Sequence, residues 1–173
     1  YIISTNSEKY VEPAFPDILI NSNYVYNAWK LFNDINLGEN DSWKSSSNLP
    51  AWVIIDFGTN VQTGSYSITS SNDDDFGTAS PKDFSLEGST NGISWTTLHT
   101  GENVGVSTPW KRNERKDYTF TAGSYRYYKF TVTAVQSASF VSLGELRLWP
   151  GYPDFFKLPD LRGQFIRGWS HGS

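Results

Sequence analysis

The chain contains no cysteine and no methionine, and only two histidines among its 173 residues. Without cysteine it can form neither a disulfide framework nor a thiolate metal site, so packing alone must hold a folded domain together. His99 lies at the end of an expected strand and His171 lies near the C-terminus, so we expect no histidine-based catalytic triad and no zinc cluster. The missing methionine, with Tyr1 in first place, suggests a fragment of a longer polypeptide.

Long apolar runs and a strong positive charge are missing as well. No apolar run approaches the roughly 18 residues needed to span a bilayer, and no charged-then-apolar leader is present, so we expect no membrane insertion. The formal net charge is -4, and the basic run at 111–116 is interrupted by Glu114. A nucleic acid is therefore not an expected partner, because phosphate-backbone binding needs a basic surface.

Motifs for catalysis are also scarce. The glycine-bearing segment 101–105 lacks the lysine and hydroxyl residue of a phosphate loop. Asp73, Asp74 and Asp75 are adjacent in one loop, whereas glycoside hydrolysis needs two carboxylates placed across the scissile bond. We therefore expect a protein that is not an enzyme.

Aromatic residues are abundant, with 7 Trp, 10 Tyr and 11 Phe. They fall in short runs that alternate apolar and polar residues, so side chains two apart share a face, as in β-strands. The clearest runs are 52–57, 65–69, 83–87, 94–98, 117–121, 125–133 and 143–148. Turn residues separate them, including Asn91-Gly92, which suits a tight turn with positive φ. This pattern predicts an all-β, two-sheet sandwich, with helix limited to a turn or two at 26–32.

The sandwich is expected to end near residue 150. The segment Trp149-Pro-Gly-Tyr-Pro153 holds two prolines and a glycine, which end a strand and stiffen the exit from it. We therefore predict a β-sandwich domain over residues 1–150 and an extended connector over 151–173.

Four phrases of the sequence, in order, resemble the discoidin family, also called coagulation factor 5/8 type C, which includes many galactose-type carbohydrate-binding modules. They lie at 41–58, 80–95, 125–132 and 143–148, and the second combines a strand, Gly-Ser, an Asn-Gly turn and a tryptophan. The resemblance implies an eight-stranded jelly-roll sandwich, in agreement with the periodicity. A family of this kind does not supply a single function.

Most of the conspicuous residues in these phrases are expected to be scaffold. Large aromatics in alternating runs remove about 150–250 Å² each from water when they are buried, so we predict core positions for Trp43, Trp52, Trp95 and Tyr127. Asp56 and Arg126 are expected to form a structural ion pair or a cap.

The loop at 32–43 is rich in the oxygen donors that Ca²⁺ prefers. In the discoidin family a calcium ion is often held by the corresponding loop together with a glutamate near the last strand. The resemblance therefore implies a structural calcium site with Asp34, Asp41 and Glu145 as ligands, although the loop departs from the usual Asp-Gly-Asn pattern. The alternative is a solvated loop closed by Asx turns.

Sugar recognition needs an aromatic face for the apolar side of a pyranose and planar polar groups for its hydroxyls. Three expected loops carry both, at 71–76, 109–113 and 136–140. The predicted carbohydrate-binding residues are Asn72, Asp75, Trp110, Arg112 and Phe140. Alternative roles stay open: Trp110 covering the core, Phe140 beginning the last strand, and the aspartate run serving as a solubilising turn.

The C-terminal segment resembles the collar-type segment of bacteriophage tail fibres, through Asp-Leu-Arg-Gly-Gln-Phe-Ile-Arg-Gly-Trp at 160–169. This resemblance implies a virion protein outside the cell that forms a homotrimer in the full fibre. The sandwich would then bind a glycan of the host surface, either lipopolysaccharide or capsule. Two alternatives are a structural spacer that helps trimer assembly and a carbohydrate-binding module carried by a polysaccharide-degrading enzyme.

Overall fold

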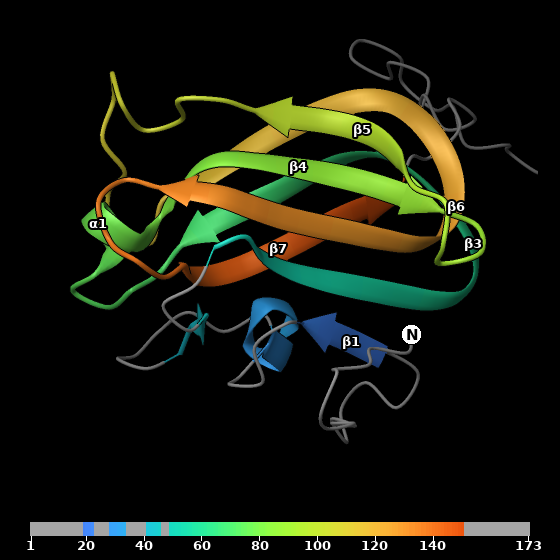
Figure 1. Cartoon of the computed structure of the whole chain (residues 1–173), viewed down its shortest axis with the longest axis horizontal. Helices are drawn as coiled ribbons and strands as arrows, with labels where there is room; N and C mark the ends of the chain where they lie inside the picture. The colour runs from blue at the N-terminus through green and yellow to red at the C-terminus, as the bar shows by residue number, and fades with distance from the viewer. Residues whose placement is uncertain (1–18, 23–27, 34–40, 46–48, 151–173) are drawn as a thin grey trace, which may run out of the picture.

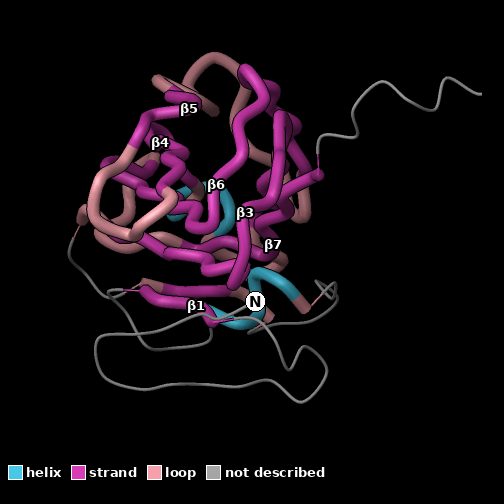
Figure 2. Tube along the Cα trace, turned by 90° about the vertical axis from the view of Figure 1, so that its right-hand side faces the viewer, coloured by secondary structure: helices cyan, strands magenta, loops and turns pink. Residues whose placement is uncertain are grey.

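The alternating runs form one antiparallel sheet that folds over on itself (Figure 1). The computed structural model describes residues 19–22, 28–33, 41–45 and 49–150. The strands are β1 (Leu19–Ser22), β2 (Trp43–Lys44), β3 (Ala51–Ser70), β4 (Pro81–Ser89), β5 (Thr96–Gly101), β6 (Arg115–Val135) and β7 (Ser142–Pro150). Helix is confined to η1 (Ala28–Phe32) and α1 (Phe76–Ala79), seen as short cyan segments in Figure 2. The predicted helical turns at 26–32 are thus confirmed over 28–32.

Two long strands, β3 and β6, pass through both layers of the sandwich. The first half of β3, residues 51–56, pairs with β1 and with the second half of β6. The second half, residues 65–69, pairs with the first half of β6 and with β7. Strands β4 and β5 extend the first layer, and β2 extends the second beyond β7. This arrangement confirms the predicted discoidin-like jelly-roll sandwich, whereas the predicted connector, 151–173, lies outside the described residues.

The bend of β3 explains why two predicted strands are one. Register shifts interrupt the pairing of β3 with β6 between Asp56 and Val61 and between Thr63 and Ser65. Gly58 adopts φ +71°, and its N–H donates to Asp56 Oδ1 at 2.7 Å. Irregularities of this kind bend a strand without ending it. The runs 52–57 and 65–69, predicted as separate strands, are therefore the two halves of β3.

The expected ion pair lies at the same bend. Arg126 of β6 donates from Nε and Nη2 to the two carboxylate oxygens of Asp56, at 2.7 and 2.8 Å. Burial alone would raise the pKa of Asp56, but the hydrogen bonds from Arg126 and the Gly58 N–H outweigh it and hold that pKa below its usual value. The prediction from sequence is confirmed.

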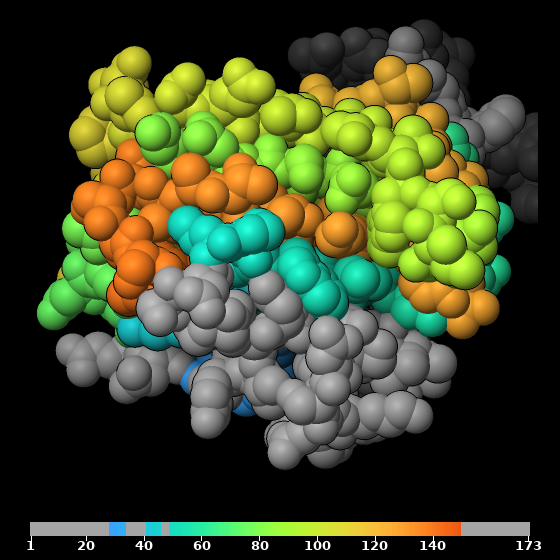
Figure 3. Space-filling model, viewed as in Figure 1, coloured from blue at the N-terminus to red at the C-terminus, as the bar shows by residue number. Residues whose placement is uncertain are grey.

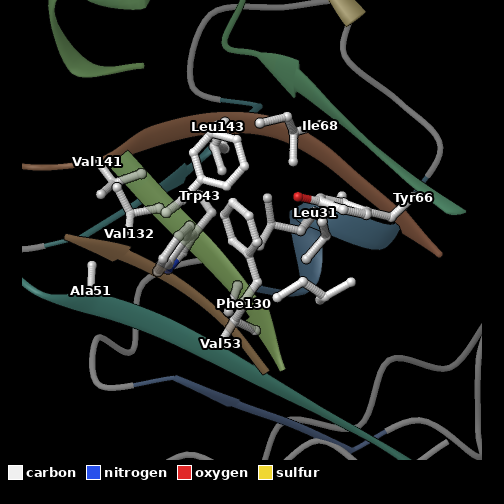
Figure 4. Close-up of a cluster of buried hydrophobic side chains, with 14 of the residues drawn as sticks. Leu31, Trp43, Ala51, Val53, Tyr66, Ile68, Phe130, Val132, Val141 and Leu143 are labelled. Atoms are coloured by element: carbon white, nitrogen blue, oxygen red, sulfur yellow. The ribbon is translucent and has the colours of Figure 1, made fainter. Parts of the chain in front are cut away.

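The core lies between the layers and is built from inward-facing rows of apolar side chains (Figure 4). Trp43, Tyr66 and Phe130 are fully buried in it. Leu31 is also fully buried, and it lies in η1, which packs against β7. Each such side chain contributes about 1.5–3 kcal/mol through its removal from water. The remaining fully buried large side chains are Ile68, Phe84, Leu86, Tyr128, Leu143, Leu146 and Val53.

The core prediction is confirmed for Trp43 and wrong for three other aromatics. Trp52, Trp95 and Tyr127 are only half-buried. Strand alternation turns Trp52 and Tyr127 away from the interior, and Trp95 lies directly before β5. Trp95 and Tyr127 instead pack under cations, with Lys129 Nζ 5.5 Å and Arg126 Cζ 4.9 Å from the respective ring centroids. None of the helices in the described part of the chain is long and apolar enough to cross a membrane.

Candidate functional site

Three loops that carry the predicted carbohydrate-binding residues meet at one end of the sandwich. They connect β3 to β4 (71–80), β5 to β6 (102–114) and β6 to β7 (136–141). In Figure 1 this is the left-hand end, where α1 lies, and Figure 3 shows the loops as adjoining green, yellow and orange surface. The opposite end holds the bend of β3 and β6. We call the first end the loop end.

Hydrogen bonds tie the three loops to one another. Ser70 N donates to the carbonyl of Glu114 at 2.9 Å, and Ser70 Oγ donates to the carbonyl of Lys111 at 2.6 Å. The carbonyl of Thr78 accepts from the N–H groups of Ser137 and Ala138, both at 3.0 Å. The loops therefore form one connected surface whose backbone is held before any ligand arrives, which reduces the entropy lost on binding.

Arg112 is the most exposed of the predicted polar residues that the loops position. Its Nη2 contacts Asp74 Oδ1 at 2.5 Å, and its Nη1 donates to the carbonyl of Asn72. Its guanidinium lies 5.1 Å from the ring centroid of Phe76. Arg112 is 41 % exposed and the Asp74 side chain is 94 % exposed, so both remain accessible from solvent. We call Asn72, Asp74, Phe76 and Arg112 the Arg112 cluster.

Asp75 has a different role from the one predicted. Its Oδ1 accepts from Ser71 Oγ at 2.9 Å, and its Oδ2 lies 2.8 Å from Lys44 Nζ. Lys44 also contacts Asp73, which is buried and accepts from Ser42 Oγ at 2.6 Å. Burial lowers the pKa of Lys44, but its bonds to the two aspartates prevail and raise it. Both oxygens of Asp75 are thus used, Oδ1 within the loop and Oδ2 in an ion pair with Lys44 of β2, and we leave it out of the proposed binding surface.

Trp110 is placed in the core rather than at the surface. Only 3 % of its area is exposed, and its Nε1 donates to the carbonyl of Pro81 at 3.0 Å. Lys116 Nζ lies 4.6 Å from the ring centroid. A ring with so little exposed area offers no face to a pyranose, so the predicted sugar contact is corrected to the alternative role of covering the core.

Phe140 is half-buried in the loop between β6 and β7. The next residue, Val141, is fully buried and donates from its N–H to Ser45 Oγ at 2.9 Å, which fixes the end of the loop. Phe140 therefore lies in the loop at the loop end, outside β7, which begins at Ser142. Its contact with a sugar remains a prediction.

Sequence reasoning missed Phe76 and Asp74 as partners of Arg112. Phe76 begins a single turn of helix whose Ala79 is buried, and this turn holds the half-buried ring at the surface. An aromatic within a run of aspartates was the available signal. The partner, however, lies 36 residues further along in sequence, and only the fold brings the two loops together.

The residues implied as calcium ligands are only partly described. Asp34 lies outside the described residues. Asp41 Oδ1 accepts from Asn33 Nδ2 at 3.1 Å, whereas its buried Oδ2 accepts no hydrogen bond from the described residues. Glu145 of β7 is 4 % exposed. Strand β2 pairs with β7 at Trp43–Leu143 and Lys44–Ser142, so Asp41 and Glu145 each lie two residues beyond the Trp43–Leu143 pair. Carboxylate and amide oxygens are ligands that Ca²⁺ accepts, although the described residues hold no group of three or more His, Cys, Asp or Glu side chains that could bind a metal ion.

Comparisons with solved structures support the fold. The chain is similar to CpGH89CBM32-5 from Clostridium perfringens in complex with GalNAc-β-1,3-galactose, with 14% identity, a TM-score of 0.62, and 77% of this chain and 95% of that chain covered. It is similar to the family 32 carbohydrate-binding module of NanJ from C. perfringens in complex with galactose, with 18% identity, a TM-score of 0.60 and coverage of 76% and 93%. It is also similar to the CBM32 of AlyQ in complex with 4,5-unsaturated mannuronic acid, with 17% identity, a TM-score of 0.60 and coverage of 75% and 92%.

These structures share the fold of carbohydrate-binding modules with this chain. No curated protein sequence matches it. The F5/8 type C domain family model, in contrast, matches residues 19–146, a range that contains every strand except the last residues of β7. The matched range stops before the segment at 160–169, so it does not bear on the tail-fibre resemblance. On this match and the observed sandwich, the chain belongs to the F5/8 type C domain family.

Proposed function

We propose that this domain is a non-enzymatic carbohydrate-binding module that binds a neutral, galactose-type sugar at the loop end. The observation that carries the proposal is the Arg112 cluster, where an ion pair and an aromatic ring share one accessible surface. Two solved modules with this fold are named as complexes with galactose or with GalNAc-β-1,3-galactose. Their ligands set the expectation for the sugar.

The charges of the cluster favour a neutral sugar. Arg112 and Asp74 neutralise each other, so a charged ligand gains little net attraction there. An exposed guanidinium is a donor and an exposed carboxylate is an acceptor, and a pair of vicinal hydroxyls can satisfy both at once. Phe76 and Phe140 supply apolar area for the less polar face of the ring. Monovalent affinity is expected to be in the millimolar to micromolar range, i.e. about -4 to -8 kcal/mol.

The test is a glycan array that includes lipopolysaccharide and capsule oligosaccharides, followed by calorimetric titration with the best binder. Arg112→Ala is expected to weaken binding about tenfold or more, since a hydrogen bond to a charged group contributes about 1.5–3 kcal/mol. Phe140→Ala is expected to weaken it as well.

Arg115→Ala is the matched control. Arg115 also lies near an exposed ring, with its Cζ 5.0 Å from the Trp149 ring centroid, and it contacts Asp117 at 2.5 Å, but it lies on β6 rather than in a loop. Binding should be unchanged in this variant. A blank array from folded protein, or equal losses in the Arg112 and Arg115 variants, would overturn the proposed site.

We further propose that a structural Ca²⁺ ion is held by Asp41, Glu145 and Asp34. Bound calcium would cross-link β2 to β7 and lie next to the loop end. Because an ion that binds only the folded state stabilises it, chelator is expected to lower the melting temperature, and Asp41→Ala is expected to abolish that dependence. Asp117→Asn, on β6, is the control. A melting temperature that does not respond to chelator would contradict the calcium site and leave the sugar site standing.

For biological context we propose host recognition by a bacteriophage tail fibre. The support is the collar-type resemblance at 160–169, which lies outside the described residues. In that setting the domain would be a virion component, and three copies on a homotrimeric fibre would raise avidity for lipopolysaccharide or capsule without new contacts. Sedimentation of the fibre protein that carries this segment should show trimers, and the isolated domain should compete with virions for host cells.

Two alternatives make different predictions. A structural spacer would bind no glycan in any assay. A module carried by a polysaccharide-degrading enzyme would bind sugars equally well, but adding it to host cells would leave phage adsorption unchanged, and the adjoining sequence would carry catalytic carboxylates rather than fibre repeats.

A further inference from the structure

A second concave site lies on the outer face of β4, β5 and β6, separate from the Arg112 cluster. It is an open pocket with a volume of about 330 Å³, near the lower limit for small-molecule sites. No residue of the Arg112 cluster lines it, and neither does Phe140. The lining residues are Asp83, Phe84, Ser85, Thr100, Gly101, Glu102, Asn103 and Thr133.

Two features form this pocket: the alternation of side chains along β4, and a short segment after β5, residues 102–104, that we call the ledge. Phe84 is buried and points inward, so its neighbours Asp83 and Ser85 face outward. The chain leaving β5 then crosses over the beginning of β4. Asn103 N donates to Asp83 Oδ1 at 2.8 Å, and Val104 N donates to the carbonyl of Lys82 at 3.0 Å. These bonds hold the ledge above the strands and give the pocket a wall.

The chemistry of the lining is acidic and rich in hydroxyls. Asp83 and Glu102 supply carboxylates, while Ser85, Thr100 and Thr133 supply hydroxyl groups. Asp83 uses Oδ1 for the ledge, and the described hydrogen bonds leave Oδ2 to the pocket. The lining contains no lysine, arginine or histidine. A ligand must therefore bring positive charge and hydrogen-bonding groups, and it cannot rely on stacking because the Phe84 ring is only 2 % exposed.

We propose that this pocket binds one residue of a cationic amino sugar, a hexosamine with a free amine. The ammonium group would contact the carboxylates of Asp83 and Glu102, and the ring hydroxyls would bond to Ser85, Thr100 and Thr133. The pocket volume suits a single sugar ring rather than a longer segment. Its preference for positive charge is opposite to the neutral preference of the Arg112 cluster, so the domain carries two sites of different specificity.

The test is NMR titration of the ¹⁵N-labelled chain with the β-1,4-linked dimer of glucosamine, and with the N,N′-diacetylated dimer as the neutral match. Amide shifts at 83–85, 100–103 and 133 are expected with the amine form, at a dissociation constant of about 1 mM. The acetylated form should bind several-fold more weakly, and added salt should weaken only the amine form.

Two variants sharpen the test. Glu102→Gln removes one exposed charge and is expected to weaken amine binding about fivefold, near the upper limit for an exposed ion pair. Asp83→Asn should do the same while its amide oxygen still accepts from Asn103 N. Asp117→Asn is the control, because it removes a carboxylate on β6, outside the pocket. Arg112→Ala should leave amino-sugar binding intact, so this site and the loop-end site can fail separately.

Three results would overturn the proposal. They are the absence of shifts in the pocket residues, shifts of equal size with both dimers, and amine binding that Glu102→Gln and Asp83→Asn leave unchanged.

Discussion

At the scale of single residues, two tyrosines of β6, the fully buried Tyr128 and the half-buried Tyr118, differ in the hydrogen bonding of their hydroxyls. Tyr128 Oη donates to the carbonyl of Val61 at 2.6 Å, whereas the buried Tyr118 Oη finds no hydrogen-bond partner among the described residues. Burial raises the pKa of each to about 12, so both hydroxyls stay protonated at neutral pH. The two residues therefore test what a buried hydroxyl contributes.

Tyr118→Phe is expected to leave stability unchanged or to raise it by up to about 1 kcal/mol, because it removes a desolvated hydroxyl. Tyr128→Phe should lower stability by about 1–3 kcal/mol, since the Val61 carbonyl loses its donor. Urea denaturation of both variants checks this. Equal losses would mean that Tyr118 has a partner of similar strength.

Gly101 is required by the space beside it. A Cβ at this position would lie 2.3 Å from the Phe84 ring, whereas a Cβ at Gly77 in α1 would meet nothing within 4 Å. Gly101→Ala is therefore expected to destabilise the fold by about 1–3 kcal/mol through overpacking. Gly77→Ala should be neutral or stabilise by up to ~1 kcal/mol, because alanine is the better helix former. Thermal denaturation of both variants measures the contrast, and a neutral Gly101→Ala would show that Phe84 can move aside.

Single residues also show how far the sequence could predict the site. Asp56 and Arg126 were identified as a pair because each ends or interrupts an apolar run, a local signal. Trp110 was misassigned because the sequence placed its ring in a polar loop, and that ring turns inward to meet the Pro81 carbonyl, 29 residues away. Burial of a loop residue depends on distant chain, so no local pattern gives it.

At the scale of elements, β5 is joined to the sandwich interior by His99. Its Nδ1 lies 2.8 Å from Tyr66 Oη of β3, and its ring lies 5.1 Å from that of Tyr118 of β6 and 6.4 Å from that of Phe84 of β4. Burial lowers the pKa of His99 from its usual value of 6.5. The imidazole of His99 is therefore harder to protonate in the folded protein than in the unfolded chain.

Stability is therefore expected to fall as the pH drops below about 6.5, because the unfolded chain then binds more protons at His99 than the folded one. His99→Gln should flatten this dependence between about pH 7.5 and pH 5. Urea denaturation across that range tests it, and His171 is present in both proteins, so it cancels in the comparison. Parallel curves for the two proteins would contradict the role of His99.

The elements themselves were largely predictable because alternation is a local property. Each expected run lies in a strand or overlaps one, and Gly92 has the positive φ expected of the Asn-Gly turn. The joining of runs into β3 and β6 was not predictable, since turn residues at 58–60 mark a bend as readily as an end. Trp52 was predicted to face the core because its side chain is large and apolar. Its neighbours in β3, Ala51 and Val53, are buried, so strand alternation places Trp52 on the outer face.

At the scale of the whole molecule, the two layers share β3 and β6 and are therefore expected to unfold together. Tryptophan fluorescence and far-UV circular dichroism should show one coincident urea transition. A chain ending at residue 141 lacks β7, which is the second pairing partner of the second half of β3, residues 65–69. It is expected to show no cooperative transition, whereas a chain ending at 150 keeps it. Cooperative unfolding of the shorter chain would show that the layers are independent.

The pairing of β3 also determines when it can fold during synthesis, because its partners in β6 and β7 follow it in the chain. Its partners in β6 run from Arg115, opposite Thr69, to Val132, opposite Ala51, and its partners in β7 come later still. Strand β1 precedes β3 and can pair with residues 53–56. The edge of β3 that pairs with β6, however, stays open while a ribosome adds the 80 or so residues between Ala51 and Val132, at about 5–20 residues per second. The emerging chain therefore holds an aggregation-prone strand for several seconds and completes the sandwich only when residue 150 has left the exit tunnel. We therefore expect chaperones that shield nascent strands to reduce aggregation of this chain during that interval.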